Sequence, residues 1–212
     1  MLKGTAAEAG YYRFLELHIV PVLVRLRLKP NHITLLGLLT SILAGLSFAF
    51  SPFWGGAFTL LTGFVDTLDG CLARTLGQEQ KFGAFLDSVL DRYTELLIYL
   101  GIWSYFYRRG FSVPVLSILI LLLLFGSLMV SYTRARAEGL GQRCLVGVLQ
   151  RGERIILLGA AGILNPLVNR LFDGSGFWAE DLALFISLLI LAVGTNLTAL
   201  WRFAYVLNNL RR

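Results

Sequence analysis

Residues 63–91 read GFVDTLDGCLARTLGQEQKFGAFLDSVLD, and long apolar runs flank this stretch on both sides. It carries aspartates at four positions, Asp66, Asp69, Asp87 and Asp91. An ionised carboxylate inside a membrane-spanning helix costs roughly 2.5–3.5 kcal/mol or more unless it faces a partner or a polar cavity. The helices around these residues must therefore be arranged so that the four carboxylates face the interior.

The composition places this chain in a membrane. The sequence has 212 residues, the size of one domain, and 56% of them are hydrophobic. A helix needs about 20 mainly apolar residues to cross the hydrocarbon layer. Applied along the chain, this length predicts an all-α integral membrane protein with six transmembrane helices. The expected spans are Ile33–Phe50, Trp54–Leu76, Phe82–Tyr107, Val113–Arg134, Val146–Leu171 and Trp178–Leu207.

A further helix is expected before the first span, over Tyr11–Leu28. Its apolar residues recur every three or four positions with charged residues between them, a pattern typical of an amphipathic helix lying in the membrane interface. The apolar stripe consists of Tyr12, Leu15, Ile19, Val22 and Leu26. The sequence thus divides into residues 1–30, a cytoplasmic N-terminus with the interfacial helix, and residues 31–212, a single six-helix transmembrane domain.

The basic residues indicate the orientation. With six spans and a cytoplasmic N-terminus, only Arg108, Arg109 and Arg170 of the 19 lysines and arginines lie near the outer face. The rest are expected on the cytoplasmic side, as the positive-inside rule requires. The net charge of +6 therefore follows from topology and from attraction to anionic lipids, and does not indicate nucleic-acid binding. We expect a protein of the cell (inner) membrane whose active site faces the cytoplasm.

The aspartate spacing predicts a metal site. Asp66 and Asp69 are three residues apart and Asp87 and Asp91 are four apart, so each pair shares one face of its helix. Because the two helices run in opposite directions, Asp66 and Asp91 are expected at a deeper level and Asp69 and Asp87 at a shallower one. Hard oxygen ligands select Mg²⁺, Mn²⁺ or Ca²⁺, and four carboxylates suit a pair of ions that can hold a diphosphate.

Small residues next to the aspartates leave room for a flat base. Gly70 and Ala73 lie on one helix and Gly83 on the next, and Arg74 follows at the membrane surface, where its guanidinium can bind a phosphate oxygen. Glycine and alanine in membrane helices also serve helix packing, and that alternative stays open for each of them taken singly.

Together these residues form the pattern Asp66-x2-Asp69-Gly70-x2-Ala73-Arg74-x8-Gly83-x3-Asp87-x3-Asp91. The pattern resembles the signature of the CDP-alcohol phosphotransferase family at every fixed position. The resemblance implies that a CDP-linked lipid such as CDP-diacylglycerol binds with its diphosphate on two metal ions, Mg²⁺ or Mn²⁺. An alcohol hydroxyl then attacks the phosphorus that bears the lipid, and CMP leaves.

The resemblance also implies the residue roles. Asp66, Asp69 and Asp87 are expected mainly as metal ligands, and Asp91 as the general base, also in contact with a metal. The nucleotide is expected to contact Asp66 and Asp69 and a strip that consists of Asn31, Thr34, Gly70, Ala73, Arg74 and Gly83. Asn31 follows Pro30 at the start of a span, so ordinary helix capping is an alternative for it.

Arginines around the fourth, fifth and sixth spans indicate an acceptor that carries a phosphate. The expected phosphate-binding residues are Arg134, Arg151, Arg154 and Arg202. Arg151 and Arg154 lie in the first turns of a helix, where the macrodipole disfavours cations, so a nearby anion explains them better than helix propensity does. Snorkelling to lipid phosphate is the alternative for arginines near helix ends, and it is strongest for Arg136 and Arg151.

The stretches that carry these arginines resemble those of phosphatidylinositol-phosphate synthases, although Gln150 replaces a glutamate of that pattern. The acceptor therefore stays open between inositol 1-phosphate, which we favour, and glycerol 3-phosphate. The lipid chains, acyl or isoprenoid, cannot be read from the sequence. The resemblance further implies a homodimer.

A cation-coupled transporter is a more distant alternative, since carboxylates within membrane helices also mark ion pathways. A transporter of this kind would carry its acids in two matching halves. Here all four aspartates lie in one adjacent pair of helices and no internal repeat is found. The enzyme interpretation is therefore preferred.

Overall fold

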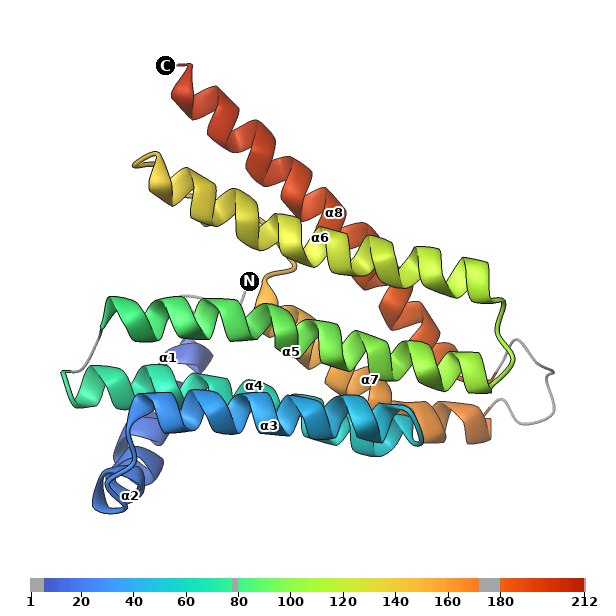
Figure 1. The fold of residues 1–212 in the computed structure, drawn as a ribbon, viewed down its shortest axis with the longest axis horizontal. Helices are drawn as coiled ribbons and strands as arrows, with labels where there is room; N and C mark the ends of the chain where they lie inside the picture. Colours follow the sequence, from blue (N-terminus) through green and yellow to red (C-terminus); the bar gives the residue numbers. More distant parts are fainter. Residues whose placement is uncertain (1–5, 78–79, 172–179, 212) are drawn as a thin grey trace.

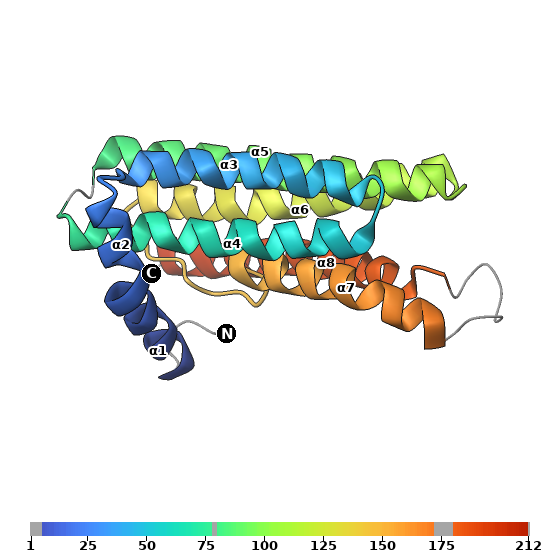
Figure 2. The ribbon, with the colours of Figure 1, turned by 90° about the horizontal axis from the view of Figure 1, so that it is seen from below.

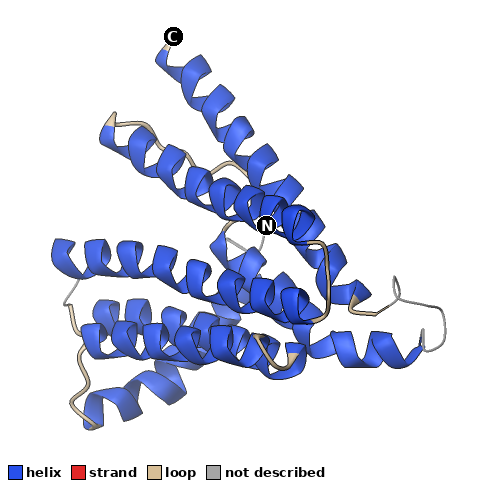
Figure 3. Ribbon diagram, turned by 45° about the vertical axis from the view of Figure 1, so that its right-hand side comes forward, coloured by secondary structure: helices blue, strands red, loops and turns tan. Residues whose placement is uncertain are grey.

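The computed structural model describes residues 6–77, 80–171 and 180–211, and all regular structure within them is helical (Figure 3). The all-α expectation is therefore confirmed. Six helices contain 19 residues or more. They are α3 (Pro30–Phe48), α4 (Pro52–Thr75), α5 (Lys81–Arg108), α6 (Val113–Gly139), α7 (Arg151–Leu171) and α8 (Leu182–Leu210).

The six long helices form one bundle (Figure 1). Helix α3 packs extensively against both α4 and α5, α4 packs against α7, and α6 packs against α8. Helices α4 and α5 touch each other only slightly, although the chain joins them by a short connection. The bundle thus holds α4 and α5 apart, with α3 bridging them on one side.

Four described helices are long and apolar enough to cross a membrane, namely α3, α6, α7 and α8. At about 1.5 Å per residue, α4 with 24 residues and α5 with 28 are also long enough to span the hydrocarbon layer. Charged residues lower the hydropathy of these two, because α4 and α5 carry the four aspartates. The structure is that of an integral membrane protein.

The fifth expected span begins later than the sequence predicts, and the expected start of the sixth falls on residues that the structure does not describe. The expectation that a helix starts at Val146 is wrong, because α7 starts at Arg151 and residues 142–150 are not helical. Gly147 has φ of 116°, a conformation that cannot continue a right-handed helix. Helix α8 starts at Leu182, whereas the expected start at Trp178 lies outside the described residues.

A bent helical run precedes α3, and it consists of α1 (Ala6–Phe14), the π-helical turn η1 (Leu15–Ile19) and α2 (Val20–Arg25). The wider turn comes just before Pro21, whose ring would clash with the carbonyl of an ordinary preceding turn. Figure 2 shows α1 and α2 projecting from the end of the bundle where α3 begins and α4 ends.

The π turn divides the predicted apolar stripe. Leu15 is fully buried, and Tyr12 and Ile19 pack against the same cluster on α4. Beyond the turn, Val20 is buried in this cluster, whereas Val22 and Leu26 are exposed. The extra residue in a π turn rotates the following helix, so a stripe predicted at constant helical spacing no longer follows a single face.

Asp181 connects three helices at the end of the bundle where α5 ends and α8 begins. It lies directly before α8 with φ of 61° and is fully buried. Its carboxylate accepts hydrogen bonds from Tyr105 Oη at 2.8 Å and Asn165 Nδ2 at 2.6 Å, and from Arg109 Nε at 3.2 Å. These contacts join α5, α7 and the start of α8.

Glycines allow α4 and α7 to approach closely. A Cβ atom on Gly56 would lie 2.8 Å from the backbone nitrogen of Ile163 and 2.9 Å from Cα of Gly162. Both neighbours belong to the α7 backbone and cannot rotate away. The short distance between α4 and α7 therefore depends on the missing side chain, as is common in membrane helix pairs.

We expect Gly56→Val to destabilise the bundle by about 1–3 kcal/mol, the usual range for overpacking. The thermal unfolding midpoint of the purified protein in detergent would measure this. Gly10→Ala is the matched control, because nothing lies within 4 Å of a Cβ at Gly10 in α1. An unchanged midpoint for Gly56→Val would contradict the close packing of α4 on α7.

Candidate active site between α3, α4, α5 and α7

The four aspartates lie in the space that the bundle leaves between α4 and α5. Helix α4 supplies Asp66 and Asp69, and α5 supplies Asp87 and Asp91. A small cavity of about 10 Å³ separates them, which is room for about one water molecule. Its polar lining consists of Thr34, Thr62, Asp66, Asp69, Asp87, Asp91, Thr94 and Arg151.

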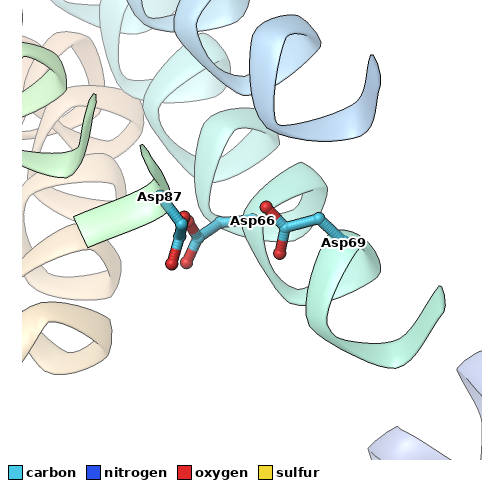
Figure 4. A group of neighbouring side chains, drawn as sticks. All are labelled: Asp66, Asp69 and Asp87. Carbon is cyan, nitrogen blue, oxygen red and sulfur yellow. The ribbon is translucent and has the colours of Figure 1, made fainter. Parts of the chain in front are cut away.

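Three of the aspartates form a compact group. Asp66, Asp69 and Asp87 each offer a carboxylate oxygen, and these oxygens lie within 4.8 Å of one another. Figure 4 shows Asp66 between the other two, with Asp87 reaching it from α5. The sequence prediction that these residues meet from two helices is confirmed by this geometry. Asp91, also predicted as a metal ligand, lies outside the group.

Arg151 connects Asp91 to the group. Its guanidinium forms an ion pair with Asp66 through Nη1, and its Nη2 lies 2.8 Å from Oδ1 of Asp91. The exposed fraction of the Asp91 side chain is 13% and that of Arg151 is 19%, so water screens these charges weakly. Arg151 contacts both Asp66 and Asp91, so these two residues lie at a similar level of the bundle, as the sequence predicts.

The group fits a divalent cation. Ligand oxygens around one Mg²⁺, Mn²⁺ or Ca²⁺ ion sit about 2.0–2.6 Å from the metal, so any two of them lie at most about 4–5 Å apart. The 4.8 Å limit on the oxygens of Asp66, Asp69 and Asp87 satisfies this requirement. Three hard carboxylate donors also match the chemistry of such ions.

Several residues of the predicted nucleotide strip border this group. Thr34 donates a hydrogen bond from Oγ1 to Oδ2 of Asp69 at 2.8 Å. The side-chain oxygen of Asn31 lies 3.5 Å from the position that a Cβ on Gly83 would occupy. The start of α3 and the start of α5 thus meet near the aspartates, and Thr34 contacts one of them directly.

The remaining members of the strip lie on the last turns of α4. Arg74 folds back along its own helix, and its Nη1 lies 3.5 Å from the position of a Cβ on Gly70. Its Nη2 lies 3.3 Å from Sγ of Cys71. Ala73 is half-buried on the same helix, one turn beyond Asp69. The Arg74 side chain therefore lies beside Gly70.

Arg154 and Arg202 are the two deeply buried residues among the four predicted acceptor arginines. The side chain of Arg154 is 3% exposed and forms an ion pair with Glu95 of α5, which is 7% exposed. Arg154 Nε donates to Glu95 Oε1 at 3.2 Å, and its Nη1 donates to the carbonyl of Leu149 at 3.1 Å. Arg154 therefore joins α7 to α5 one helical turn after Arg151.

Arg134 and Arg202 stand farther out, on α6 and α8. Arg202 is buried and donates to the carbonyls of Val146 at 2.7 Å and Val130 at 2.6 Å. Arg134 is more exposed and pairs with Glu138 at 2.8 Å within its own helix. Among the four predicted acceptor arginines, Arg151 lines the cavity between the aspartates, and Arg134 and Arg202 do not.

Sequence reasoning missed Glu95, which continues the series Asp87, Asp91 at the same four-residue spacing within an apolar helix. That periodicity was a usable signal, because a fifth carboxylate in a membrane helix also needs a partner. It missed Tyr12 as well, whose ring lies against Arg74, with 5.3 Å between the ring centroid and Cζ. No local pattern points to that contact, since it joins residues far apart in the chain.

Comparison with known families identifies the class. The family model described as CDP-alcohol phosphatidyltransferase matches residues 27–190, which is well over half of the chain. An archaetidylinositol phosphate synthase of Methanothermobacter thermautotrophicus is 37% identical over 194 residues, covering 91% of this chain and 90% of that protein. A phosphatidylinositol phosphate synthase of Streptomyces avermitilis is 35% identical over 190 residues, covering 87% and 74%.

Solved structures agree with the sequence relatives. The phosphatidylinositol phosphate synthase of Mycobacterium tuberculosis with CDP-DAG bound is 29% identical and superposes with a TM-score of 0.74, covering 89% of this chain and 91% of that one. The same enzyme with manganese and citrate gives a TM-score of 0.73 at 29% identity, covering 90% and 88%. The chain belongs to the CDP-alcohol phosphatidyltransferase family and is a CDP-alcohol phosphotransferase. The predicted resemblance is confirmed.

Replacing Glu95 by alanine is expected to destabilise the protein by about 3–5 kcal/mol, because Arg154 would remain buried without its counter-charge. Denaturant or thermal unfolding in detergent would measure the loss. Glu138→Ala is the matched control, since Glu138 is half exposed and its ion pair with Arg134 should contribute only about 0–1 kcal/mol. Equal losses for the two variants would refute the structural importance of the Glu95 pair.

Proposed function

We propose that this protein transfers a phosphatidyl group, or its archaeal equivalent, from a CDP-linked lipid to inositol 1-phosphate and releases CMP. The observation that carries the proposal is that the acidic group of Asp66, Asp69 and Asp87 lies beside Arg151, with the buried Arg154 one helical turn away. The acidic group suits the diphosphate of the donor, and the arginines suit a phosphorylated acceptor. The relatives named for inositol phosphate lipid synthesis support this acceptor.

The proposal includes two divalent metal ions, either Mg²⁺ or Mn²⁺. Asp66, Asp69 and Asp87 would hold them, with Asp91 as a further ligand at the edge of the group. When bound, the metal would supply positive charge that neutralises the diphosphate and stabilises the leaving group. The manganese complex of the Mycobacterium tuberculosis relative supports a metal of this kind.

The nucleotide strip would orient the donor. Thr34 donates a hydrogen bond to Asp69, and Asn31 lies beside Gly83. A cytidine on this strip would therefore lie next to the acidic group. The absence of side chains at Gly70 and Gly83 and the small Ala73 leave the base room to lie flat. Arg74 would bind the diphosphate from the surface side. The CDP-DAG complex of the relative supports a CDP-lipid as the donor.

The acceptor would lie between Asp91 and the arginines. Arg151 touches Asp91, and its buried Nε atom makes no hydrogen bond within the described part of the chain. A phosphate held by Arg151, with Arg134, Arg154 and Arg202 contributing to the positive edge, would place the inositol hydroxyls near Asp91. Specific positioning of this kind converts a bimolecular reaction into an effectively intramolecular one.

The chemical step is a single displacement at phosphorus. The hydroxyl oxygen of the acceptor forms a bond to the phosphorus that bears the lipid, and the bond from that phosphorus to the CMP oxygen breaks. Asp91 accepts the hydroxyl proton as general base, and CMP leaves with the electron pair. Asp91 is suited to this role because a base must reach the acceptor hydroxyl. In this structure it lies on the arginine side of the acidic group, where the acceptor is proposed to bind.

The proposal includes a topology and an assembly. All six long helices would span the membrane, including α4 and α5, with residues 1–30 forming a separate interfacial segment and residues 31–212 one transmembrane domain. The start of α3, the end of α4 and the start of α7 would face the cytoplasm, where most lysines and arginines lie. The enzyme would reside in the cell (inner) membrane, in contact with membrane lipids, as a homodimer. The positive-inside distribution of charge supports this orientation.

Asp91→Asn is expected to reduce transfer by at least about a hundredfold, in line with the loss of a general base, while the protein still folds. Turnover would be measured as CMP release, and folding as the thermal midpoint in detergent. Glu180→Gln is the control carboxylate, because Glu180 is exposed and pairs with Arg109 far from the site. Full turnover by Asp91→Asn would remove this residue from the base role.

The identity of the acceptor is tested with the purified wild-type protein, CDP-diacylglycerol and Mg²⁺ or Mn²⁺. We expect inositol 1-phosphate to stimulate CMP release, and glycerol 3-phosphate, free inositol and serine to leave it at the background rate. Chelation of the metal by EDTA should abolish the stimulated release. Stimulation by glycerol 3-phosphate alone would keep the reaction class and overturn the proposed acceptor.

A further inference from the structure

The N-terminal helical run packs against α4, the helix that carries Asp66 and Asp69. Leu15 and Val20 are 0% and 1% exposed, and they pack into a cluster with Val65, Cys71 and Leu72 of α4. These α4 residues alternate with the signature residues that bear the proposed chemistry. A helix that contacted only the membrane interface would not bury two side chains completely against α4.

Tyr12 places an aromatic ring on Arg74. The guanidinium carbon of Arg74 lies 5.3 Å from the centroid of the Tyr12 ring, within the range of a cation–π contact. On its other sides the guanidinium touches Sγ of Cys71 and the open face of Gly70. Arg74 is otherwise exposed, and a long side chain without such contacts samples many rotamers.

Tyr11 fixes the same helix to the acidic segment of α4. Its hydroxyl lies 2.8 Å from Oγ1 of Thr67, the residue that follows Asp66. The rings of Tyr11 and Tyr12 meet edge to face with their centroids 5.7 Å apart. The hydrogen bond of Tyr11 to Thr67 and the buried Leu15 therefore hold the helix that carries Tyr12 against α4.

We propose that Tyr12 is a positioning residue that holds the Arg74 guanidinium over Gly70, ready to bind the diphosphate of the CDP-lipid. The proposal rests on the proposed role of Arg74 in donor binding, and it gives the N-terminal helix a part in substrate recognition besides membrane attachment. Tyr12 acts through Arg74 and does not itself touch the reacting atoms. Its removal therefore affects the affinity for the donor and leaves the affinity for the acceptor unchanged.

The test is direct binding of CDP-dioleoylglycerol to the full-length protein in detergent with Mn²⁺, which needs no acceptor and no turnover. Tyr12→Leu should weaken binding about two- to fivefold, the range for a cation–π contact at an exposed site. Tyr12→Phe keeps the ring and should bind like the wild type. Phe14→Leu is the matched control, since it removes an exposed ring of the same helix that stacks on His18.

The Tyr12→Leu change is then repeated in an Arg74→Ala background. If Tyr12 acts through Arg74, the second change should cause no further loss, whereas independent effects would multiply. An equal loss in both backgrounds, or an equal loss for Tyr12→Phe and Tyr12→Leu, would overturn the proposal. Thermal midpoints within a few degrees of the wild type, as expected for all four single variants, exclude unfolding as the cause of weaker binding.

Two further outcomes separate this proposal from the proposed function. If Arg74→Ala binds CDP-dioleoylglycerol as tightly as the wild type, then Arg74 is not a donor ligand and Tyr12 has nothing to position. If the wild type binds the CDP-lipid but inositol 1-phosphate fails to stimulate CMP release, the acceptor is wrong. The Tyr12 comparison still decides the present proposal in that second case, because it is read from donor binding alone.

Discussion

Arg151 holds together two carboxylates that the apolar surroundings would otherwise drive apart. It pairs with Asp66 on α4 and with Asp91 on α5, and it comes from the first residue of α7. Because mutual repulsion of buried carboxylates is large at low dielectric, packing these helices around ionised aspartates requires positive charge among them. The separation of α4 from α5 and the position of α7 both meet that requirement.

The arginines at this edge of the bundle divide into two kinds. Arg154 is committed to Glu95 and to the carbonyl of Leu149, and Arg202 to two further carbonyls. Such groups supply positive potential, and part of their hydrogen-bonding capacity is already used within the protein. Arg151 is different, since its partners are the carboxylates of the reaction site and its Nε donor is unused within the described structure. Under the proposed function, arginines only one helical turn apart would thus serve packing in one case and substrate binding in the other.

Under the two proposals, membrane attachment and substrate binding would also share one element, the helical run before α3. The helical run before α3 exposes Phe14 and Leu17, which suits an interface, while it buries Leu15 and places Tyr12 on Arg74. The π turn before Pro21 makes this double use possible, since it turns the second half of the run relative to the first. The donor lipid and the helix that helps to bind its headgroup would then occupy the same interface.

The sequence by itself determined the all-helical fold and the three clustered aspartates, because helical periodicity and the intolerance of lipid for charge act locally. The family followed from the resemblance of the aspartate pattern to a known signature. The start of α7 was missed because the short apolar run at residues 144–149 looks like the beginning of a span. The rotation at the π turn was missed because it interrupts the regular helical period from which the stripe was predicted. Only the tertiary structure decided that Arg154 pairs with Glu95, 59 residues away, and that Tyr12 meets Arg74. Such pairings depend on which helix faces are brought together, and packing against the whole bundle sets that choice.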